Sequence, residues 1–371
     1  MDFFRGVALW WIFMDHIPGN WVAQFSLRNF ALCDATEIFV LLAGYAAGIA
    51  YFRSYQRFGW LFAGADVLRR AWTLYIAHIF LFVVFAAQVS YSATALDRAD
   101  YLDEIHLDVL AEAPYRAMLE ALLLNFQPAY LNILPLYVAL LCLLGFVLPL
   151  MRWPVVLLGL SFTLYAVARW MGWNLPSWTD GGWYFNPLAW QLLFFMGAVL
   201  SQHPLKPAIG KRAVDAAAVV VVVVGLLLVW LVWPSDDVSA RVPRFLTRTL
   251  LMVDKEGLHP MRLISILALT WLAARLIPFS AHWLRGKAAF PFILCGQHSL
   301  PVFCCGIALS FLGRLTMEQQ GGWQAQAVVN ALGPLALVGV GALAAWYRDK
   351  GRAAQREDLP QPAASGNVKV I

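Results

Sequence analysis

Side chains that could do acid–base chemistry lie within the most apolar parts of this sequence. The first group, Arg5, Asp15 and His16, belongs to the stretch D-F-F-R-G-V-A-L-W-W-I-F-M-D-H-I-P-G-N. On a helix, Arg5 and His16 would share one face about 16 Å apart, so a cation and a base could act on one substrate. The alternative is that Arg5 is an ordinary basic flank of a membrane span and that His16 is a packed polar residue bonded to Asp15.

Two acids open the next apolar run, C-D-A-T-E-I-F-V-L-L-A-G-Y. Asp34 and Glu37 are three residues apart and share one face if a helix has begun. A carboxylate that reached the far ring nitrogen of His16 would fix its tautomer and raise its basicity. We therefore expect Glu37 to orient a catalytic His16 or to balance its charge, with Asp34 and Asp15 as second choices. The alternative is that Asp34 caps this helix and that Glu37 completes a capping box.

Arginines gather before the third apolar run, L-R-R-A-W-T-L-Y-I-A-H. Arg69 and Arg70, with Arg53 nearby and Arg5 in the first run, suit the phosphates of a nucleotide-bearing donor. An arginine group of this kind is also the ordinary mark of a cytoplasmic loop. Four deeper polar residues could line a site or merely pack, and these are Tyr75, His78, Gln297 and His298.

These residue types favour one reaction. A histidine within the membrane, a carboxylate to orient it and arginines toward the cytoplasm fit transfer of an acyl group from an inside donor to an outside hydroxyl, with His16 removing the hydroxyl proton. The same charges could serve as a relay in a transporter or flippase for a glycan or an acyl carrier. A membrane scaffold is a third possibility, in which the histidine would tolerate replacement.

The composition decides the class of protein that must position these groups. Of the 371 residues, 61% are hydrophobic and 13% are charged, whereas a soluble domain carries about 25% charged residues. This excludes a soluble globular enzyme and predicts an all-α polytopic bundle of about ten transmembrane helices in a lipid bilayer. The net charge of +5 is expected of cytoplasmic loops and does not indicate a nucleic-acid partner. The five cysteines mostly lie inside apolar runs and have no metal-type spacing with histidines, so we interpret them as small core residues and expect no metal site. We also expect no bound cofactor.

The hydrophobic runs predict the spans. Gly44, Gly48 and Gly197 fall in the two short spans, the second and the sixth, which indicates close helix packing there. No internal repeat is visible, which distinguishes the chain from many transporters. The predicted spans are 4–24, 36–52, 71–91, 131–150, 154–171, 188–202, 214–233, 263–278, 290–313 and 328–347.

Charge sets the expected orientation. With both termini inside, most of the 27 lysines and arginines lie on the cytoplasmic side, as the positive-inside rule requires. The long loop near 93–130 is acidic and is expected outside. We therefore predict a membrane domain over 1–347, N-in and C-in, followed by a disordered cytoplasmic tail over 348–371.

The motifs above resemble those of a known family. Together with L-N-I-L-P-L-Y-V, F-N-P-L-A-W-Q-L-L-F and G-Q-H-S-L-P-V-F, they look like the OpgC family, which succinylates periplasmic glucans, over residues 2 to about 303. That family resembles a branch of the acyltransferase-3 superfamily, whose first span has an aspartate, an arginine with a glycine, and a histidine. Asp2, Arg5, Gly6 and His16 match those positions, and Glu37 matches an acidic residue before a later motif.

The resemblance implies a ten-span enzyme of the bacterial inner membrane with His16 as its essential base. The implied co-substrate is succinyl-CoA or another acyl-CoA, the implied acceptor is a periplasmic glucan, and the glucan-synthesis machinery is a further partner to consider. Two departures stand out. The superfamily separates its two arginines at the third span by two residues, whereas here Arg69 and Arg70 are adjacent and Thr73 fills the second position. An aspartate is usual where this chain has Asn132.

Overall fold

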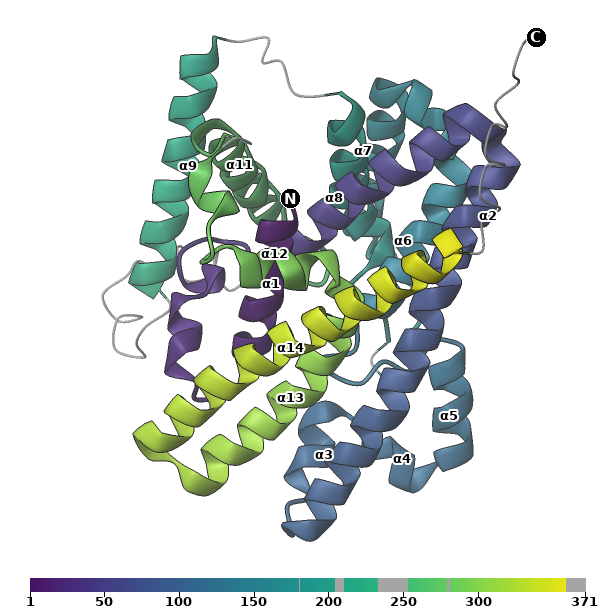
Figure 1. Ribbon diagram of the computed structural model, residues 1–371. Coiled ribbons are helices and arrows are strands. Elements are labelled where there is room, and N and C mark those ends of the chain that lie inside the picture. The colour runs from purple at the N-terminus through teal and green to yellow at the C-terminus, as the bar shows by residue number, and fades with distance from the viewer. Residues whose placement is uncertain (180, 204–209, 233–252, 279–280, 358–371) are drawn as a thin grey trace, which may run out of the picture.

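The computed structural model describes residues 1–371 except 180, 204–209, 233–252, 279–280 and 358–371. Every long element of the described residues is an α-helix (Figure 1). Six of the described helices are long and apolar enough to cross a membrane, judged by length and composition. The protein is therefore an all-α membrane protein. These six are Ala35–Ala95, Ile133–Arg152, Pro154–Met171, Lys211–Trp230, Ser299–Gln320 and Gly322–Lys350.

The helices follow the hydrophobic runs of the sequence, with short helices α3 to α5 in the acidic segment that was expected outside. Their bounds are α1 Asp2–Asp15, α2 Ala35–Ala95, α3 Asp100–Ile105, α4 Val109–Glu112, α5 Pro114–Leu122, α6 Ile133–Val147, α7 Pro154–Met171, α8 Pro187–Gln202, α9 Lys211–Val232, α11 Pro260–Leu276, α12 Phe290–Gln297, α13 Ser299–Gln320 and α14 Gly322–Glu357.

Helix α2 replaces two predicted spans and the loop expected between them. The chain stays helical from Ala35 to Ala95 except at Gly59, where φ is 82° and ψ is 179°. Such a conformation is open essentially to glycine alone, so one residue redirects the chain, and the two halves of α2 diverge from a bend (Figure 1). The expectation of a loop over 53–70 is therefore wrong.

Two predicted spans are interrupted, each near a proline. Helix α1 ends at Asp15, and Pro18 and Gly19 then lead into 3-10 turns, so the first span does not continue to 24 as predicted. The predicted span 290–313 is divided into α12 and α13 at His298. Pro301 explains the break, because a proline ring clashes with the carbonyl four residues earlier, here that of Gln297.

Close helix packing at the glycines is confirmed. A Cβ atom on Gly44 would overlap the Phe194 carbonyl of α8, and one on Gly197 would overlap the Leu41 carbonyl of α2. Glycine also lets α1 approach α12, where a Cβ on Gly6 would overlap the Phe292 carbonyl. These contacts hold α1 against α12 and α2 against α8.

Helices α13 and α14 lie side by side and cross the bundle in Figure 1. We expected a disordered tail from 348, but α14 remains helical to Glu357. The rest of the predicted tail, 358–371, lies outside the described residues.

Candidate functional site

A cavity of about 370 Å³ opens where α1 ends and where α2 and α6 begin. Three of the four residues predicted to be catalytic line it, namely Asp15, His16 and Asp34. The fourth, Glu37, is completely buried one helical turn below Asp34. Other polar lining residues, which the sequence analysis did not identify, are Arg28, Thr36, His106, Gln127, Tyr130, Ser177, Trp183, Tyr184 and Lys255.

His16 is the half-buried residue that ends α1, and its ring is oriented by the helix itself. Its Nδ1 lies 2.6 Å from the carbonyl oxygen of Ile12. A carbonyl oxygen can only accept, so Nδ1 carries the proton and Nε2 keeps the basic lone pair. The ring also packs edge-on against Tyr130, with 4.6 Å between the ring centroids. The imidazole is thereby held in one tautomer and one orientation, with Nε2 left free of this hydrogen bond.

The contact expected between Glu37 and His16 is not made. One oxygen of Glu37 accepts from the backbone N–H of Asp34 at 2.9 Å, and the other accepts from Arg262 Nε at 2.6 Å. The Asp34 side chain accepts from Thr36 N at 2.7 Å, so Asp34 and Glu37 form a capping box at the start of α2. The capping alternative is confirmed, and the orienting contact of His16 comes from a backbone carbonyl.

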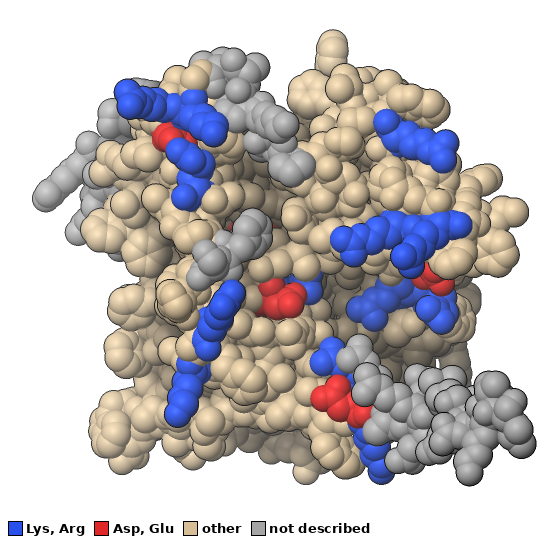
Figure 2. Space-filling view, turned by 45° about the horizontal axis from the view of Figure 1, so that its top comes forward, with Lys and Arg blue, Asp and Glu red and all other residues tan. Residues whose placement is uncertain are grey.

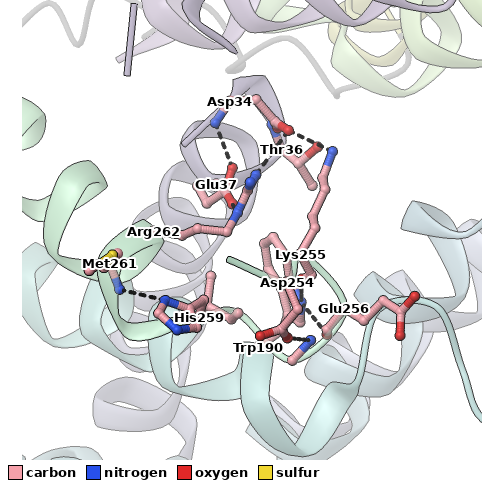
Figure 3. Close-up of polar contacts among 12 residues, drawn as sticks. Asp34, Thr36, Glu37, Trp190, Asp254, Lys255, Glu256, His259, Met261 and Arg262 are labelled. Carbon is pink, nitrogen blue, oxygen red and sulfur yellow. Dashed lines mark hydrogen bonds and ion pairs between the residues drawn. The ribbon is translucent and has the colours of Figure 1, made fainter. Parts of the chain in front are cut away.

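Asp34 and Glu37 belong to a charge network with two cations (Figure 3), in which Glu37 is buried and the other three side chains are partly exposed. Asp34 Oδ2 lies 2.7 Å from Lys255 Nζ and 3.0 Å from Arg262 NH2. Burial alone would raise the pKa of Asp34, but the two cations hold that pKa well below its usual range. Burial alone would lower the pKa of Lys255, but Asp34 and Glu37 outweigh it and raise the pKa. Asp34 and Lys255 are therefore both charged at neutral pH.

The loop that carries Lys255 is held against α7 and α8. The fully buried Trp190 of α8 donates its indole N–H to the carbonyls of Lys255 and Glu256, at 3.2 and 3.0 Å. Tyr165 of α7 donates its hydroxyl to the Leu258 carbonyl at 2.8 Å. A neighbouring ion pair joins Arg169 NH2 to Asp254 Oδ1 at 2.9 Å. These contacts fix the position of Lys255 at the cavity.

One signal in the sequence could have identified Lys255 and Arg262. Both follow the predicted seventh span and so belong to the minority of basic residues on the expected outer side. The positive-inside rule gives no reason for cations there, so we expect them to form ion pairs with acidic side chains. Their partners, Asp34 and Glu37, are more than 200 residues away in the chain, and sequence spacing could not pair them.

Asp15 faces the same cavity but does not contact His16. Its Oδ1 accepts from the Ser26 hydroxyl at 2.7 Å and lies 3.3 Å from Arg28 Nε. Asp15 thus holds the turns after α1 against the end of that helix. The alternative in which Asp15 hydrogen-bonds to the His16 ring is therefore wrong.

A second cavity of about 170 Å³ contains two of the four predicted donor-binding arginines. Arg5 and Arg70 line it together with Tyr51, Tyr137 and Ser299. Arg5 NH1 donates to the Gly296 carbonyl at 3.3 Å, and NH2 donates to the Leu42 carbonyl at 3.4 Å. Helix α1 therefore brings Arg5 to one cavity and His16 to the other.

The other two arginines lie on the surface of α2. Arg53 is exposed, and Arg69 is 83% exposed and lies 3.7 Å from Asp66. The structure places neither of them in a cavity.

The four deeper polar residues do not line either cavity. Tyr75 donates its hydroxyl to the Leu122 carbonyl at 2.9 Å. His78 is fully buried, and neither ring nitrogen has a hydrogen-bond partner among the described residues. Gln297 is exposed, and His298 is buried at the break between α12 and α13. Among the described residues, no three His, Cys, Asp or Glu side chains are grouped to hold a metal ion.

Comparison with known proteins identifies the family. A family model described as OpgC protein matches residues 1–349, which include both cavities. No curated protein and no solved structure matches the chain. The match covers far more than half of the sequence, so the chain belongs to the OpgC family, and this membership indicates a membrane protein with an acyltransferase type of function.

Proposed function

We propose that this protein is an O-acyltransferase of the bacterial inner membrane that transfers an acyl group, in particular succinyl, from an acyl-CoA to hydroxyls of a periplasmic glucan. The observation that carries the proposal is His16, whose Nδ1 is bonded to the Ile12 carbonyl and whose ring lines a cavity of about 370 Å³. A cavity of this volume is within the range of small-molecule sites and suits a sugar residue of the acceptor.

The chemistry begins at His16 Nε2. An acceptor hydroxyl donates to this nitrogen and loses its proton to it as the oxygen attacks the thioester carbonyl. The new C–O bond forms, the C–S bond breaks, and the imidazolium returns the proton to the leaving thiolate. Lys255, which lines the same cavity and is held charged by Asp34, stabilises the negative charge that develops on the carbonyl oxygen. Glu37 acts indirectly, by fixing Asp34 and Arg262.

The donor is proposed to enter from the second cavity. Arg5 and Arg70 line that cavity, and a guanidinium is well suited to bind a phosphate or a carboxylate. Arg53 and Arg69 are exposed on α2 and are available to phosphates that lie outside the cavity. The proposed co-substrate is succinyl-CoA, and no tightly bound cofactor is invoked.

We also propose the N-in and C-in arrangement with about ten spans in the lipid bilayer. Six described helices meet the length and hydropathy expected of a span, and Pro187–Leu200 is a shorter apolar helix. Figure 2 turns the top of Figure 1 forward and shows a face on which Lys and Arg predominate over Asp and Glu. A predominance of cations is expected of a cytoplasmic face.

The test is transfer of label from radiolabelled succinyl-CoA to a neutral glucan by the purified protein. We expect label on the sugar with the wild type and loss of transfer with His16→Ala, while His282→Ala, which replaces an exposed histidine, retains it. Full transfer by the His16 variant would overturn the mechanism. Label that stays on the protein would instead reveal a covalent intermediate.

The second candidate is a transporter or flippase for a glycan or an acyl carrier. The observation in its favour is that two cavities are formed by shared helices, as a substrate path would require. The same assay separates the two functions, because a transporter moves glycan across vesicles without transferring label to it.

A further inference from the structure

The two cavities are built on the same helices. Helix α1 contributes Arg5 to the smaller cavity and His16 to the larger one. Helices α2, α6 and α13 also line both cavities. They contribute Phe39, Tyr137 and Ser299 to the smaller cavity. To the larger cavity they contribute Thr36, Ile133 and Phe303.

The spacing along these helices shows how close the cavities are. Phe39 follows Thr36 by three residues, and Tyr137 follows Ile133 by four. At 1.5 Å per residue, these offsets correspond to about 5 to 6 Å along the helix axes. Along α2 and α6, the linings of the two cavities therefore approach each other to within about one layer of side chains.

Phe39 and Phe303 form that layer. Their rings are stacked, with 6.3 Å between centroids and 30° between planes. Phe39 borders the smaller cavity and Phe303 the larger one, and both side chains are buried. The contact between the two rings therefore runs from one cavity to the other.

The rest of the α2 lining is made of small residues. Between Ala35 and Ala50, every α2 residue that lines either cavity is alanine or threonine, apart from Phe39. A helix face of small side chains leaves space beside the helix, and Phe39 is the bulky residue set into it. The α2 lining is therefore made of small side chains on both sides of Phe39.

We propose that Phe39 and Phe303 are a gate between the two cavities, and that an extended thioester arm passes from the arginine-lined cavity to His16 when these rings move apart. The gate itself follows from the two cavities and the stacked rings. The identity of the molecule that passes it rests on the proposed function.

The gate can be tested without measuring acyl transfer. Ser299→Cys places a thiol in the smaller cavity, and the protein is reconstituted in vesicles and exposed to a small charged methanethiosulfonate from one side at a time. Matching proteins without the added cysteine give the background from the five native thiols. With Phe39 and Phe303 intact, the introduced thiol should react from one side only.

Phe39→Ala combined with Phe303→Ala should make the introduced thiol reactive from both sides. We expect the rate from the previously closed side to rise by about tenfold, which corresponds to a barrier lowered by about 1.4 kcal/mol. The matched control is Phe85→Ala with Phe311→Ala, because this buried pair joins the same two helices at 5.9 Å but lines neither cavity. The control pair should leave the one-sided reactivity unchanged.

The milder Phe39→Leu with Phe303→Leu keeps the test usable if the alanine pair does not fold, and it should give the same direction of change. Equal one-sided reactivity in the wild-type and gate variants would overturn the gate. Phe39→Trp then tests the passing molecule, because it should slow transfer from succinyl-CoA while Phe85→Trp does not. If the gate variants are labelled from both sides but the wild type transfers no acyl group from succinyl-CoA, the gate is retained and the proposed function is rejected.

Discussion

Arg262 is expected to be the most sensitive member of the charge network around α2. Its guanidinium is paired with Glu37 at 2.6 Å and with Asp34 at 3.0 Å, and the Glu37 side chain has no exposed surface. Arg262→Met would leave Glu37 without a cation, whereas Asp34 would keep Lys255 at 2.7 Å. Removing one partner of a buried pair typically costs about 3 to 5 kcal/mol, and we expect this loss for Arg262→Met.

Replacing the anionic partner, Glu37, should reduce the free energy of unfolding by less than replacing Arg262. Glu37→Gln leaves Arg262 paired with Asp34 and retains an amide oxygen that can accept from the guanidinium, so we expect a loss of about 1 to 3 kcal/mol. The double variant Arg262→Met with Glu37→Gln removes the uncompensated charge, so it should be more stable than Arg262→Met alone.

Thiol exposure offers a suitable assay. Cys33 and Cys295 are almost completely buried, so a thiol-reactive dye reports unfolding of the detergent-solubilised protein during a denaturant titration. The double-mutant cycle then gives the coupling energy between Arg262 and Glu37. The reasoning would be refuted if Arg262→Met were within about 1 kcal/mol of the wild type, since even an isolated exposed pair can contribute that much. It would also fail if the double variant were no more stable than the single one.

Three further predictions follow from the geometry. Gly44→Val should prevent normal folding because its Cβ would overlap the Phe194 carbonyl, whereas Gly159→Val, at an open position, should give normal yields on size-exclusion chromatography. Gly59→Ala should lower the free energy of unfolding by about 1 to 3 kcal/mol because alanine is strained at this φ and ψ, and this is measurable by the dye assay. Because the pKa of Lys255 is raised above its ordinary value of 10.5, its stabilising contribution is complete below that pH and declines as pH rises through the folded-state pKa. Wild-type stability should therefore fall more steeply above this pH than that of Lys255→Met, and parallel curves would contradict the prediction.

Composition and hydrophobic runs predicted the class of the protein and the places of most helices. They failed where a single residue changes the chain direction. Gly59 lies in a run that also contains charged residues, and nothing in that pattern distinguishes a bend inside a helix from a loop between helices. The break at His298 had a visible signal in Pro301, since proline disrupts the bond to the carbonyl four residues earlier.

The candidate site was predicted in part. His16, Asp15 and Asp34 reach one cavity as a group because they lie at the ends of α1 and α2. The expected contact between Glu37 and His16 is wrong because Glu37 pairs with Arg262, which only tertiary packing brings to it. Short-range signals, such as the capping box, were reliable because they depend only on neighbouring residues.

The bend at Gly59 also indicates where the membrane surface lies. Phe58, Leu61 and Phe62 around it are 64%, 78% and 71% exposed, which would be unfavourable in water. Trp60 is 47% exposed and donates its indole N–H to the Gly145 carbonyl, as suits a ring in the headgroup layer. The turn between the halves of α2 is thus suited to rest among the lipid headgroups instead of projecting into solvent. A turn held at that depth would set the height of the bundle relative to the bilayer, and with it the level at which a water-soluble donor would first meet the protein.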